Sequence, residues 1–498
     1  MIAVEERTGI EFPRQILKHN VILSCIVFTL FWTIYPFARA AFRLQVDYNE
    51  GWNIYNAERV VNHLPLYPVA YGWQTVNYPA LSFAIMAFLH GFTHEYLFTA
   101  RVVSLLSLVL GCALVGAIVH RLGGSTRASL LAGFFCLGVF CTDASPYVGM
   151  DDPQLLAHLF FLLGLFVYLE RRKSLPVLAW AAALFVIAGS IKHNPLDFPL
   201  AVLLDLTIVS WRRALWFSLC GLVFAVGSVV WNIHFGGPFF VSQMLAPRVW
   251  LLGKAVETSV DSLGPLAVPL CIAFATAWNM RHDPRRRIGA LLLACSLLIG
   301  VAFAGGAGVW INTFFSIFFA MSVVLGLFLN DLELNPGRIF RRGHTYRPIA
   351  AYVPVLLFAW LLIPAIVAGL WNPVHELRAT VAAQRRFDQE TAFLRAHSSP
   401  QICESLLLCS FAGEPYIYDP FNATRLVRFG KLDPQLMLDG LRQHSYGVVE
   451  LEQHDSGDMV QAERFPGSVI AAIQQNYRPV LSNEDVILYL PKAATPVR

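Results

Sequence analysis

"AFRLQVDYNEGWN", residues 41–53, is the stretch of sequence that decides the fold. It follows an apolar run of about twenty residues, which is the length a helix needs to cross the ~30 Å hydrocarbon core of a bilayer. Two carboxylates, Asp47 and Glu50, come directly after this run and have aromatic residues around them. If a helical turn begins there, both side chains fall on the same side of it. The stretch therefore predicts a polar surface at the mouth of a membrane helix.

The composition of the chain is that of a polytopic membrane protein. Of its 498 residues, 56% are hydrophobic and 14% are charged, and the mean hydropathy is +0.54. A soluble protein of this length would have too little polar surface at that ratio. The net charge of +4 is small, and no stretch resembles a basic arm for nucleic acid. We therefore expect membrane lipids as partners and no nucleic acid.

About eleven segments are apolar and long enough to be predicted as membrane helices. They lie near residues 19–41, 98–119, 127–142, 153–170, 174–190, 196–210, 214–235, 262–280, 288–304, 311–330 and 349–371. Residues 153–210 fit either two spans or three. The predicted fold class is an α-helical polytopic membrane protein, with a membrane domain at residues 1–371 and a large first outer loop at residues 42–97.

The distribution of Lys and Arg predicts the orientation of these spans. With a cytoplasmic N-terminus, the inner loops hold more than twice as many of these cations as the outer loops do. The inner cations are Arg7, Arg14, Lys18, Arg121, Arg127, Arg171, Arg172, Lys173, Arg212, Arg213, Arg281, Arg285, Arg286, Arg287, Arg338, Arg341, Arg342 and Arg347. Ala38-Arg39-Ala40 resembles a signal-peptide cleavage site, but the preceding apolar run is longer than a typical signal core. We expect a multi-pass protein of the inner (plasma) membrane.

Eleven crossings place residues 372–498 outside the cytoplasm, where they are predicted to form a small α/β domain. Helical periodicity covers residues 374–399, 433–445 and 466–477, and strand patterns cover residues 446–452 and 485–491. Cys403 and Cys409 would then lie in an oxidising space, so a disulfide closing this short loop is predicted. Two reduced thiols in a small core are the alternative.

Polar side chains gather in the predicted outer loops. The first two loops supply carboxylates, namely Asp47, Glu50, Asp143, Asp151 and Asp152. The third and fourth supply basic residues, namely Lys192, His193, Arg248 and Lys254. Further candidates for the wall of a pocket are Tyr48, Tyr78 and Asn312. An acidic cluster and a basic cluster therefore share one face of the membrane.

Such a pair of clusters suits a substrate that has a hydroxyl to activate and a phosphate to hold. A carboxylate can take the proton of an attacking hydroxyl. Lys and Arg can bind a phosphate and stabilise its charge as it leaves. We interpret the site as one for transfer of a sugar from a lipid phosphate. Asp47 is the candidate base, and Lys192 with Arg248 or Lys254 is the candidate phosphate clamp.

Simpler structural explanations stand beside these roles. Asp47 could cap a helix, and so could Asp151 or Asp152, which precede a proline that fits the first turn. Lys192 could extend from a helix end toward the membrane interface. His193 is more often structural than catalytic, and a buried asparagine such as residue 312 could join two membrane helices by a hydrogen bond.

A transporter or flippase for a lipid-linked sugar is the alternative function. Such a protein would need ionisable residues in the middle of several spans, because these mark the path of a polar substrate. The middles of the predicted spans are almost uniformly apolar, which favours the enzyme.

The chain resembles the GT-C glycosyltransferases, in the branch of the protein O-mannosyltransferases and aminoarabinose transferases. The stretches that carry the resemblance are "DYNEGWNIY" (47–55), "NYPALSF" (77–83), "GMDDPQ" (149–154), "GAGVWINTFF" (306–315) and "CESLLLCSFAGEPYIYDPFN" (403–422). The resemblance implies a GT-C fold, a polyprenyl-phosphate-linked sugar donor, and a lipid, glycan or protein acceptor. It also implies inversion at the anomeric carbon.

The resemblance assigns roles to the acids of the first two loops. Asp47 matches the first-loop acid that is the usual candidate for the base, and Glu50 matches a neighbouring acid that positions the base or the acceptor. Asp151 or Asp152 matches the second-loop acid, which in some relatives helps to hold a divalent cation. A site for Mg²⁺, Mn²⁺ or Ca²⁺ at Asp47, Asp151 and Asp152 is therefore a candidate. The D-x-x-E spacing, where the mannosyltransferases have adjacent acids, leaves open which acid is the base and whether a metal is used.

Overall fold

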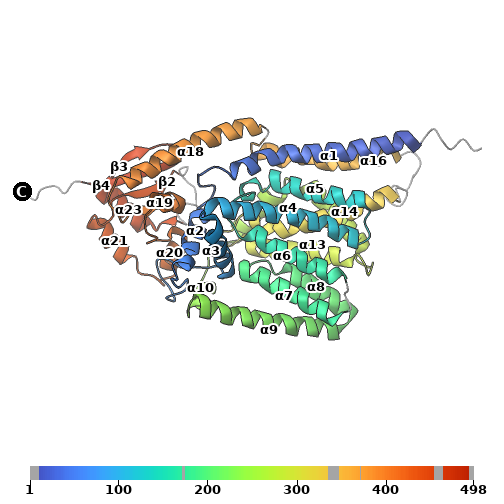
Figure 1. Cartoon of the computed structure of the whole chain (residues 1–498), viewed down its shortest axis with the longest axis horizontal. Coiled ribbons are helices and arrows are strands. Elements are labelled where there is room, and N and C mark those ends of the chain that lie inside the picture. Colours follow the sequence, from blue (N-terminus) through green and yellow to red (C-terminus); the bar gives the residue numbers. More distant parts are fainter. Residues whose placement is uncertain (1–10, 171–173, 335–346, 371, 454–463, 493–498) are drawn as a thin grey trace, which may run out of the picture.

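The structure is a computed structural model that describes residues 11–170, 174–334, 347–370, 372–453 and 464–492. A bundle of long helices forms one part, and a smaller α/β domain lies at one end of it (Figure 1). Seven cations used to predict the orientation lie outside the described residues: Arg7, Arg171, Arg172, Lys173, Arg338, Arg341 and Arg342.

Every predicted apolar segment contains a helix. The helices of the bundle are α1 (Glu11–Arg39), α4 (Leu97–Arg121), α5 (Thr126–Thr142), α6 (Gln154–Glu170), α7 (Leu175–Ile191), α8 (Asp197–Val209), α9 (Trp211–Gly236), α12 (Ala267–Met280), α13 (Arg287–Ala304), α14 (Phe315–Leu334), α16 (Arg347–Trp360) and α17 (Leu362–Val367). Short 3₁₀ helices at Ser145–Tyr147 (η1) and Ile311–Phe314 (η2) precede α6 and α14.

The chain is a multi-pass membrane protein. Within the described ranges, five helices are long and apolar enough to cross a membrane, and one bent pair could make a sixth span. Five further apolar helices are shorter, at 10–17 residues. The finer count of eleven spans remains a prediction.

Two predicted spans are broken in the structure. The segment 262–280 is not one helix, because α11 (Leu252–Leu263) meets α12 at an angle of 92°. Pro265 lies in the break, and a proline has no N–H with which to continue a helix. The segment 349–371 is likewise divided between α16 and α17, where Pro364 follows the break. As a result, most of α11 lies in the connection between α9 and α12, which the sequence analysis predicts as an outer loop.

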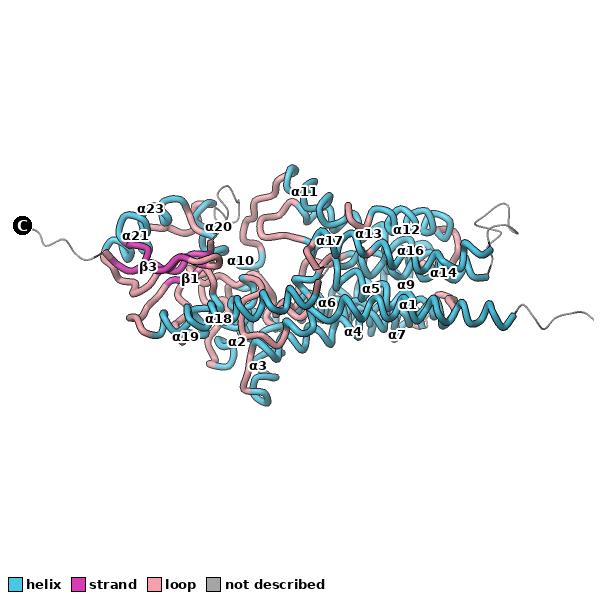
Figure 2. The backbone as a smooth tube through the Cα atoms, turned by 90° about the horizontal axis from the view of Figure 1, so that it is seen from above, coloured by secondary structure: helices cyan, strands magenta, loops and turns pink. Residues whose placement is uncertain are grey.

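The large first loop contains two helices, α2 (Tyr48–Val61) and α3 (Leu81–Thr93). A third short helix, α10 (Phe240–Met244), lies in the connection after α9. Seen from above, α2, α3 and α10 lie between the helix bundle and the C-terminal domain (Figure 2). Polar residues of the first loop, among them Asp47, Tyr48 and Tyr78, lie in or beside this layer and line a cavity.

The C-terminal domain has a four-stranded mixed sheet in the order β1-β2-β4-β3. Its strands are β1 (Ile402–Cys403), β2 (Val449–Glu452), β3 (Tyr477–Ser482) and β4 (Val486–Pro491), and only β1 and β2 run parallel. Its helices are α18 (Pro373–Arg395), α19 (Leu406–Ala412), α20 (Pro420–Arg428), α21 (Gln435–Arg442) and α23 (Gly467–Asn476). The two predicted strands and three predicted helices are present within a few residues. The edge strands β1 and β3 and the helices α19 and α20 were not predicted.

A buried ion pair fixes the first loop to the bundle. Both side chains of the pair, Glu50 on α2 and Arg101 on α4, are fully buried, and two of their N···O distances are 2.7 Å. Glu50 also accepts hydrogen bonds from the backbone N–H of Val46 (2.8 Å) and of Asp151 (3.0 Å). The carboxylate therefore joins the first loop, α4 and the second acidic loop.

Replacing Arg101 should destabilise the protein strongly. In Arg101→Met the Glu50 carboxylate stays buried without its cation, and loss of one partner of such a pair typically costs about 3–5 kcal/mol. Arg121→Met on the same helix is the matched control, because its pair with Glu170 is exposed and should contribute at most about 1 kcal/mol. Thermal unfolding in detergent measures both, and equal loss in the two variants would contradict the role of the pair.

Candidate functional site

A cavity of about 470 Å³ lies where the bundle, the first loop and the C-terminal domain meet. Seven of the predicted site residues line it: Asp47, Tyr48, Tyr78, Lys192, Arg248, Lys254 and Asn312. Five do not line it: Glu50, Asp143, Asp151, Asp152 and His193. The structure thus brings the candidate base and the candidate phosphate-binding residues to one space.

Asp47 occupies the N-cap position of α2. Its Oδ1 accepts hydrogen bonds from the backbone N–H (2.9 Å) and the side-chain amide (2.7 Å) of Asn49, as expected for a capping aspartate. Its Oδ2 accepts none from the described part of the chain. Burial raises the pKa of Asp47, while the Asn49 hydrogen bond and the Arg464 charge oppose this shift. Asp47 is therefore a cap and also an acid whose second oxygen is available in the cavity wall.

Glu50 lies behind the cavity wall. Its two oxygens are occupied by Arg101 and by the backbone N–H groups described above. This geometry suits a residue that holds the first turn of α2, and with it Asp47, in place.

Lys192 already has an anionic partner. Its Nζ lies 2.8 Å and 2.9 Å from the two carboxylate oxygens of Asp152, and 4.7 Å from the centre of the Tyr78 ring. Burial lowers the pKa of Lys192, but Asp152 and Tyr78 outweigh burial and keep this pKa above its usual value. Lys192 therefore reaches the cavity as a charged group whose field is largely cancelled by Asp152.

Two arginines of the C-terminal domain have guanidinium nitrogens without a hydrogen-bond partner among the described residues. Arg425 on α20 is 4% exposed, and none of its three guanidinium nitrogens has a hydrogen-bond partner. Arg464, which precedes α23, lines the cavity with its guanidinium carbon 3.8 Å from the centre of the Tyr48 ring, and its Nε also lacks a partner. Burial lowers the pKa of Arg248, and burial together with the charge of Arg248 lowers the pKa of Arg425 to about 10.

The sequence analysis missed Arg425 and Arg464. Both belong to the C-terminal domain, which was predicted as a separate soluble unit. The one sequence feature that pointed to this part of the C-terminal domain was the stretch that ends in "YIYDPFN", which carries part of the family resemblance. In the structure, Asp419 of this stretch accepts hydrogen bonds from Tyr48 and Trp52 on α2 and from Asn422 on α20. This buried carboxylate ties α20 to the first loop. Phe421 and Asn422 of α20 line the cavity together with Arg464, whereas Arg425 does not line it.

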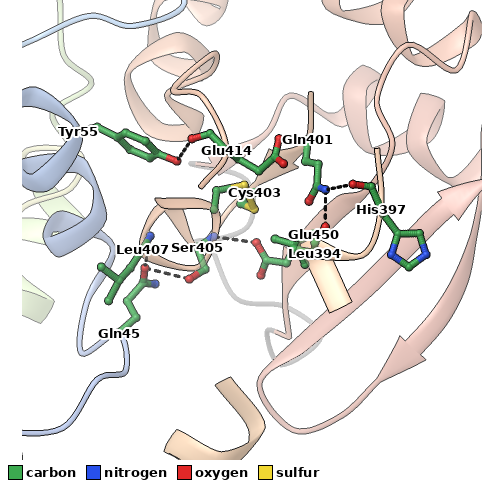
Figure 3. The surroundings of a disulfide bond; sticks show 11 residues. Gln45, Tyr55, Leu394, His397, Gln401, Cys403, Ser405, Leu407, Glu414 and Glu450 are labelled. Carbon is green, nitrogen blue, oxygen red and sulfur yellow. Dashed lines mark hydrogen bonds between the residues drawn. A yellow bond between two sulfur atoms is a disulfide. The ribbon is translucent and has the colours of Figure 1, made fainter. Parts of the chain in front are cut away.

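The disulfide of the C-terminal domain lies at the same junction. Cys403 and Cys409 are bonded, and the loop between them contacts the first loop (Figure 3). Gln45 accepts hydrogen bonds from the Ser405 hydroxyl (2.9 Å) and the Leu407 N–H (3.2 Å). The closed loop thus forms part of the surface on which α2 is seated.

The remaining predicted residues surround the cavity without lining it. Asp151 and Asp152 line a separate space of about 20 Å³. Burial, with Glu50 and Asp152, raises the pKa of Asp151 well above its usual value. Burial, with Arg248 and Lys192, lowers the pKa of His193 to about 4. His193 is therefore uncharged at neutral pH and adds no positive charge to the site.

The candidate metal site is not assembled from these residues. In the described ranges, no group of three or more His, Cys, Asp or Glu side chains could hold a metal ion. Asp47 lines the large cavity, Asp152 is paired with Lys192, and Asp151 lines the smaller space. The three acids do not fit the implied divalent cation, and we derive no step through one.

Comparison with known proteins shows the fold. No protein-family model and no curated protein sequence matches the chain. Among solved structures, ArnT from Cupriavidus metallidurans in the apo state matches with a TM-score of 0.60 and 14% identity, over 93% of this chain and 97% of that chain. ArnT from the same organism bound to undecaprenyl phosphate matches with a TM-score of 0.57 and 14% identity, over 94% of this chain and 98% of that chain.

The fold is thus that of a multi-pass membrane protein with a small C-terminal mixed sheet. More particularly, it is an ArnT-like fold over nearly the whole chain, as the sequence resemblance implied.

The buried Asp143 should make stability depend on pH. Burial raises its pKa to about 8, whereas in the unfolded chain an aspartate loses its proton near pH ~4. Between these values the unfolded state binds fewer protons, so the stability of the native protein falls as the pH rises. Asp143→Asn cannot ionise and should be more stable than the native protein at pH 8.5, by on the order of 5 kcal/mol, but only by about 1 kcal/mol at pH 4.5.

Thermal unfolding between pH 4.5 and 8.5 measures this difference. Asp433→Asn, an exposed aspartate in the C-terminal domain, serves as the control and should follow the native profile. An Asp143→Asn profile parallel to the native one would mean that this carboxyl is not held protonated.

Proposed function

We propose that the protein is a membrane glycosyltransferase. It transfers a sugar from a polyprenyl-phosphate-linked donor to a hydroxyl of a lipid, glycan or protein acceptor on the extracytoplasmic face. The ArnT-like fold supports this proposal, because one of the matching ArnT structures is bound to undecaprenyl phosphate. The site supports it independently, because Asp47, Arg248 and Arg464 line a single cavity.

The position of the cavity agrees with an extracytoplasmic site. Helix α14 starts beside the cavity-lining residues of η2, and as a 20-residue helix it extends about 30 Å to its other end. At that far end Arg127 pairs with Glu333, and Arg286 pairs with Asp331. Because arginines concentrate in cytoplasmic loops, the far end is assigned to the cytoplasm and the cavity to the opposite face.

The observation that carries the proposal is the set of arginine nitrogens without a hydrogen-bond partner in and beside the cavity wall. A buried guanidinium without hydrogen-bond acceptors is unfavourable. Among the described residues, Arg425 has no hydrogen-bond partner and Arg464 leaves its Nε unpaired, although the charges of Asp419 and Asp47 act favourably on them. A phosphate bound near Arg248 would supply acceptor oxygens. A polyprenyl phosphate has this headgroup, and its apolar chain can remain in the bilayer beside α11.

The proposed reaction is a single displacement. Asp47 takes the proton of the acceptor hydroxyl as its oxygen bonds to the anomeric carbon of the sugar. The bond from that carbon to the phosphate oxygen breaks, and its electron pair leaves with the polyprenyl phosphate. Arg248 and Arg464 stabilise the charge that develops on the leaving phosphate. Attack from the face opposite the phosphate inverts the anomeric carbon.

Replacing Asp47 tests the base. Asn at position 47 can still cap α2 but cannot accept the proton, so Asp47→Asn should lower turnover by about 10²–10⁴-fold. The assay is transfer of radiolabelled sugar from undecaprenyl-phosphate-linked donors by purified protein. Asp433→Asn is the matched control, and full activity in Asp47→Asn would remove this residue from the mechanism.

Replacing Arg425 separates a binding role from a structural one. Arg425→Met removes a buried guanidinium without a hydrogen-bond partner among the described residues, so the free protein should become more stable, by about 1–3 kcal/mol. The same change should weaken binding of undecaprenyl phosphate by about tenfold, because the positive potential of the site falls. Unfolding temperature and lipid affinity measure the two effects. A destabilised variant with unchanged affinity would show that Arg425 is structural.

A further inference from the structure

Two side chains with hydrogen-bond-accepting oxygens lie in the part of the cavity wall that belongs to the helix bundle. Asp197 begins α8, Gln154 begins α6, and both side chains line the cavity. Asp197 is 1% exposed and Gln154 is 3% exposed. In the described structure, Asp197 Oδ1 and Gln154 Oε1 are buried without a hydrogen-bond partner. We name this surface the acceptor floor (Gln154 and Asp197), because its oxygens accept hydrogen bonds; the name does not refer to the acceptor substrate.

The hydroxyl groups nearest to Asp197 are engaged in a network of hydrogen bonds. His158 Nδ1 lies 2.8 Å from the carbonyl oxygen of Gln154 and must carry a hydrogen, because a carbonyl only accepts. In the neutral ring, Nε2 then accepts from the Ser316 hydroxyl at 3.0 Å. Ser296 donates to the other oxygen of Asp197, Oδ2, at 2.8 Å. The single hydrogens of Ser316 and Ser296 are therefore engaged in these two bonds. Ser316 and the backbone N–H groups of Asp197 and Phe198 also lie near the Asp197 carboxylate. In the described structure none of them makes a hydrogen bond to Oδ1, which can accept one from a ligand.

The acceptor floor excludes two of the three parts of the proposed donor. An ionised phosphate has no hydrogen to donate and is repelled by the Asp197 carboxylate. A polyprenyl chain has no polar hydrogen at all. The sugar is the part that offers compact donors, because each hydroxyl has one hydrogen and a protonated amine has three.

We infer that the acceptor floor is the subsite for the donor sugar, which donates hydrogen bonds to Asp197 Oδ1 and Gln154 Oε1. This inference rests on the proposed function and extends it to the sugar. Lys192 and Asp197 lie five residues apart on one connection, and both line the cavity. A sugar on the floor can therefore remain linked to a phosphate held near Arg248. The site selects sugars that present two donors on this side, as hydroxyls or as a protonated amine.

Asp197→Asn and Gln154→Met test the inference by ligand binding. The asparagine keeps an oxygen for Ser296 but replaces the free charged acceptor with an amide N–H₂, and the methionine removes the amide oxygen at similar size. The probes are undecaprenyl phosphate and undecaprenyl-phosphate-linked glucose, galactose, arabinose and glucosamine, bound to the full chain in nanodiscs. Asp433→Asn is the control, and a cooperative unfolding transition close to or above the native temperature confirms that each variant is folded.

Each variant should bind the best sugar-linked probe at least tenfold more weakly than the native protein, but undecaprenyl phosphate within twofold. A loss confined to the glucosamine probe assigns the Asp197 partner to an amine, and a loss with the other probes assigns it to a hydroxyl. Equal losses with and without the sugar, or no loss, would overturn the inference while leaving the proposed function intact. A native protein that does not bind undecaprenyl phosphate would instead refute the proposed function.

Discussion

The buried ion pair between Glu50 and Arg101 is the constraint on which the site depends. It holds the first turn of α2 against α4, and Asp47 caps that same turn. Through the N–H of Asp151, the Glu50 carboxylate also fixes the second acidic loop, where the next residue pairs with Lys192. One desolvated carboxylate thus sets the positions of an acid and a cation that line the cavity. A buried ion pair is stable only when the remaining hydrogen-bonding groups of both side chains also have partners. Here backbone N–H groups bind Glu50, and backbone carbonyl oxygens bind Arg101.

The charged groups around the cavity differ in how fully their hydrogen bonds are satisfied. Asp152 compensates Lys192, and hydrogen-bond donors surround the buried carboxylate of Asp419. Among the described residues, the guanidinium of Arg425 and the Nε of Arg464 lack hydrogen-bond partners, and the proposed phosphate would bring acceptors to this region. The C-terminal domain is consequently a part of the site, since both arginines come from it and Asp419 seats it on α2.

The sequence predicted the helices well because hydropathy and period are local properties. It also placed Asp47, Lys192 and Arg248 together, because each follows or precedes an apolar run on the same predicted side. It could not assign a partner to Glu50, since Arg101 lies 51 residues away inside an apolar helix. The pairing of Lys192 with Asp152 and the reach of Arg464 to Tyr48 are likewise tertiary contacts. Pro265 could have indicated the helix break, but the apolar run around it was long enough to be predicted as a single span.

A structure of the full chain with undecaprenyl phosphate in a lipid nanodisc tests the central claim most directly. The account predicts that the phosphate lies in the cavity lined by Asp47, within hydrogen-bond distance, about 3 Å, of the Arg248 guanidinium. Lipid chains should then extend into the membrane from that point. A phosphate at the opposite end of the bundle, or one that leaves Arg248 and Arg464 without an anion, would contradict the account.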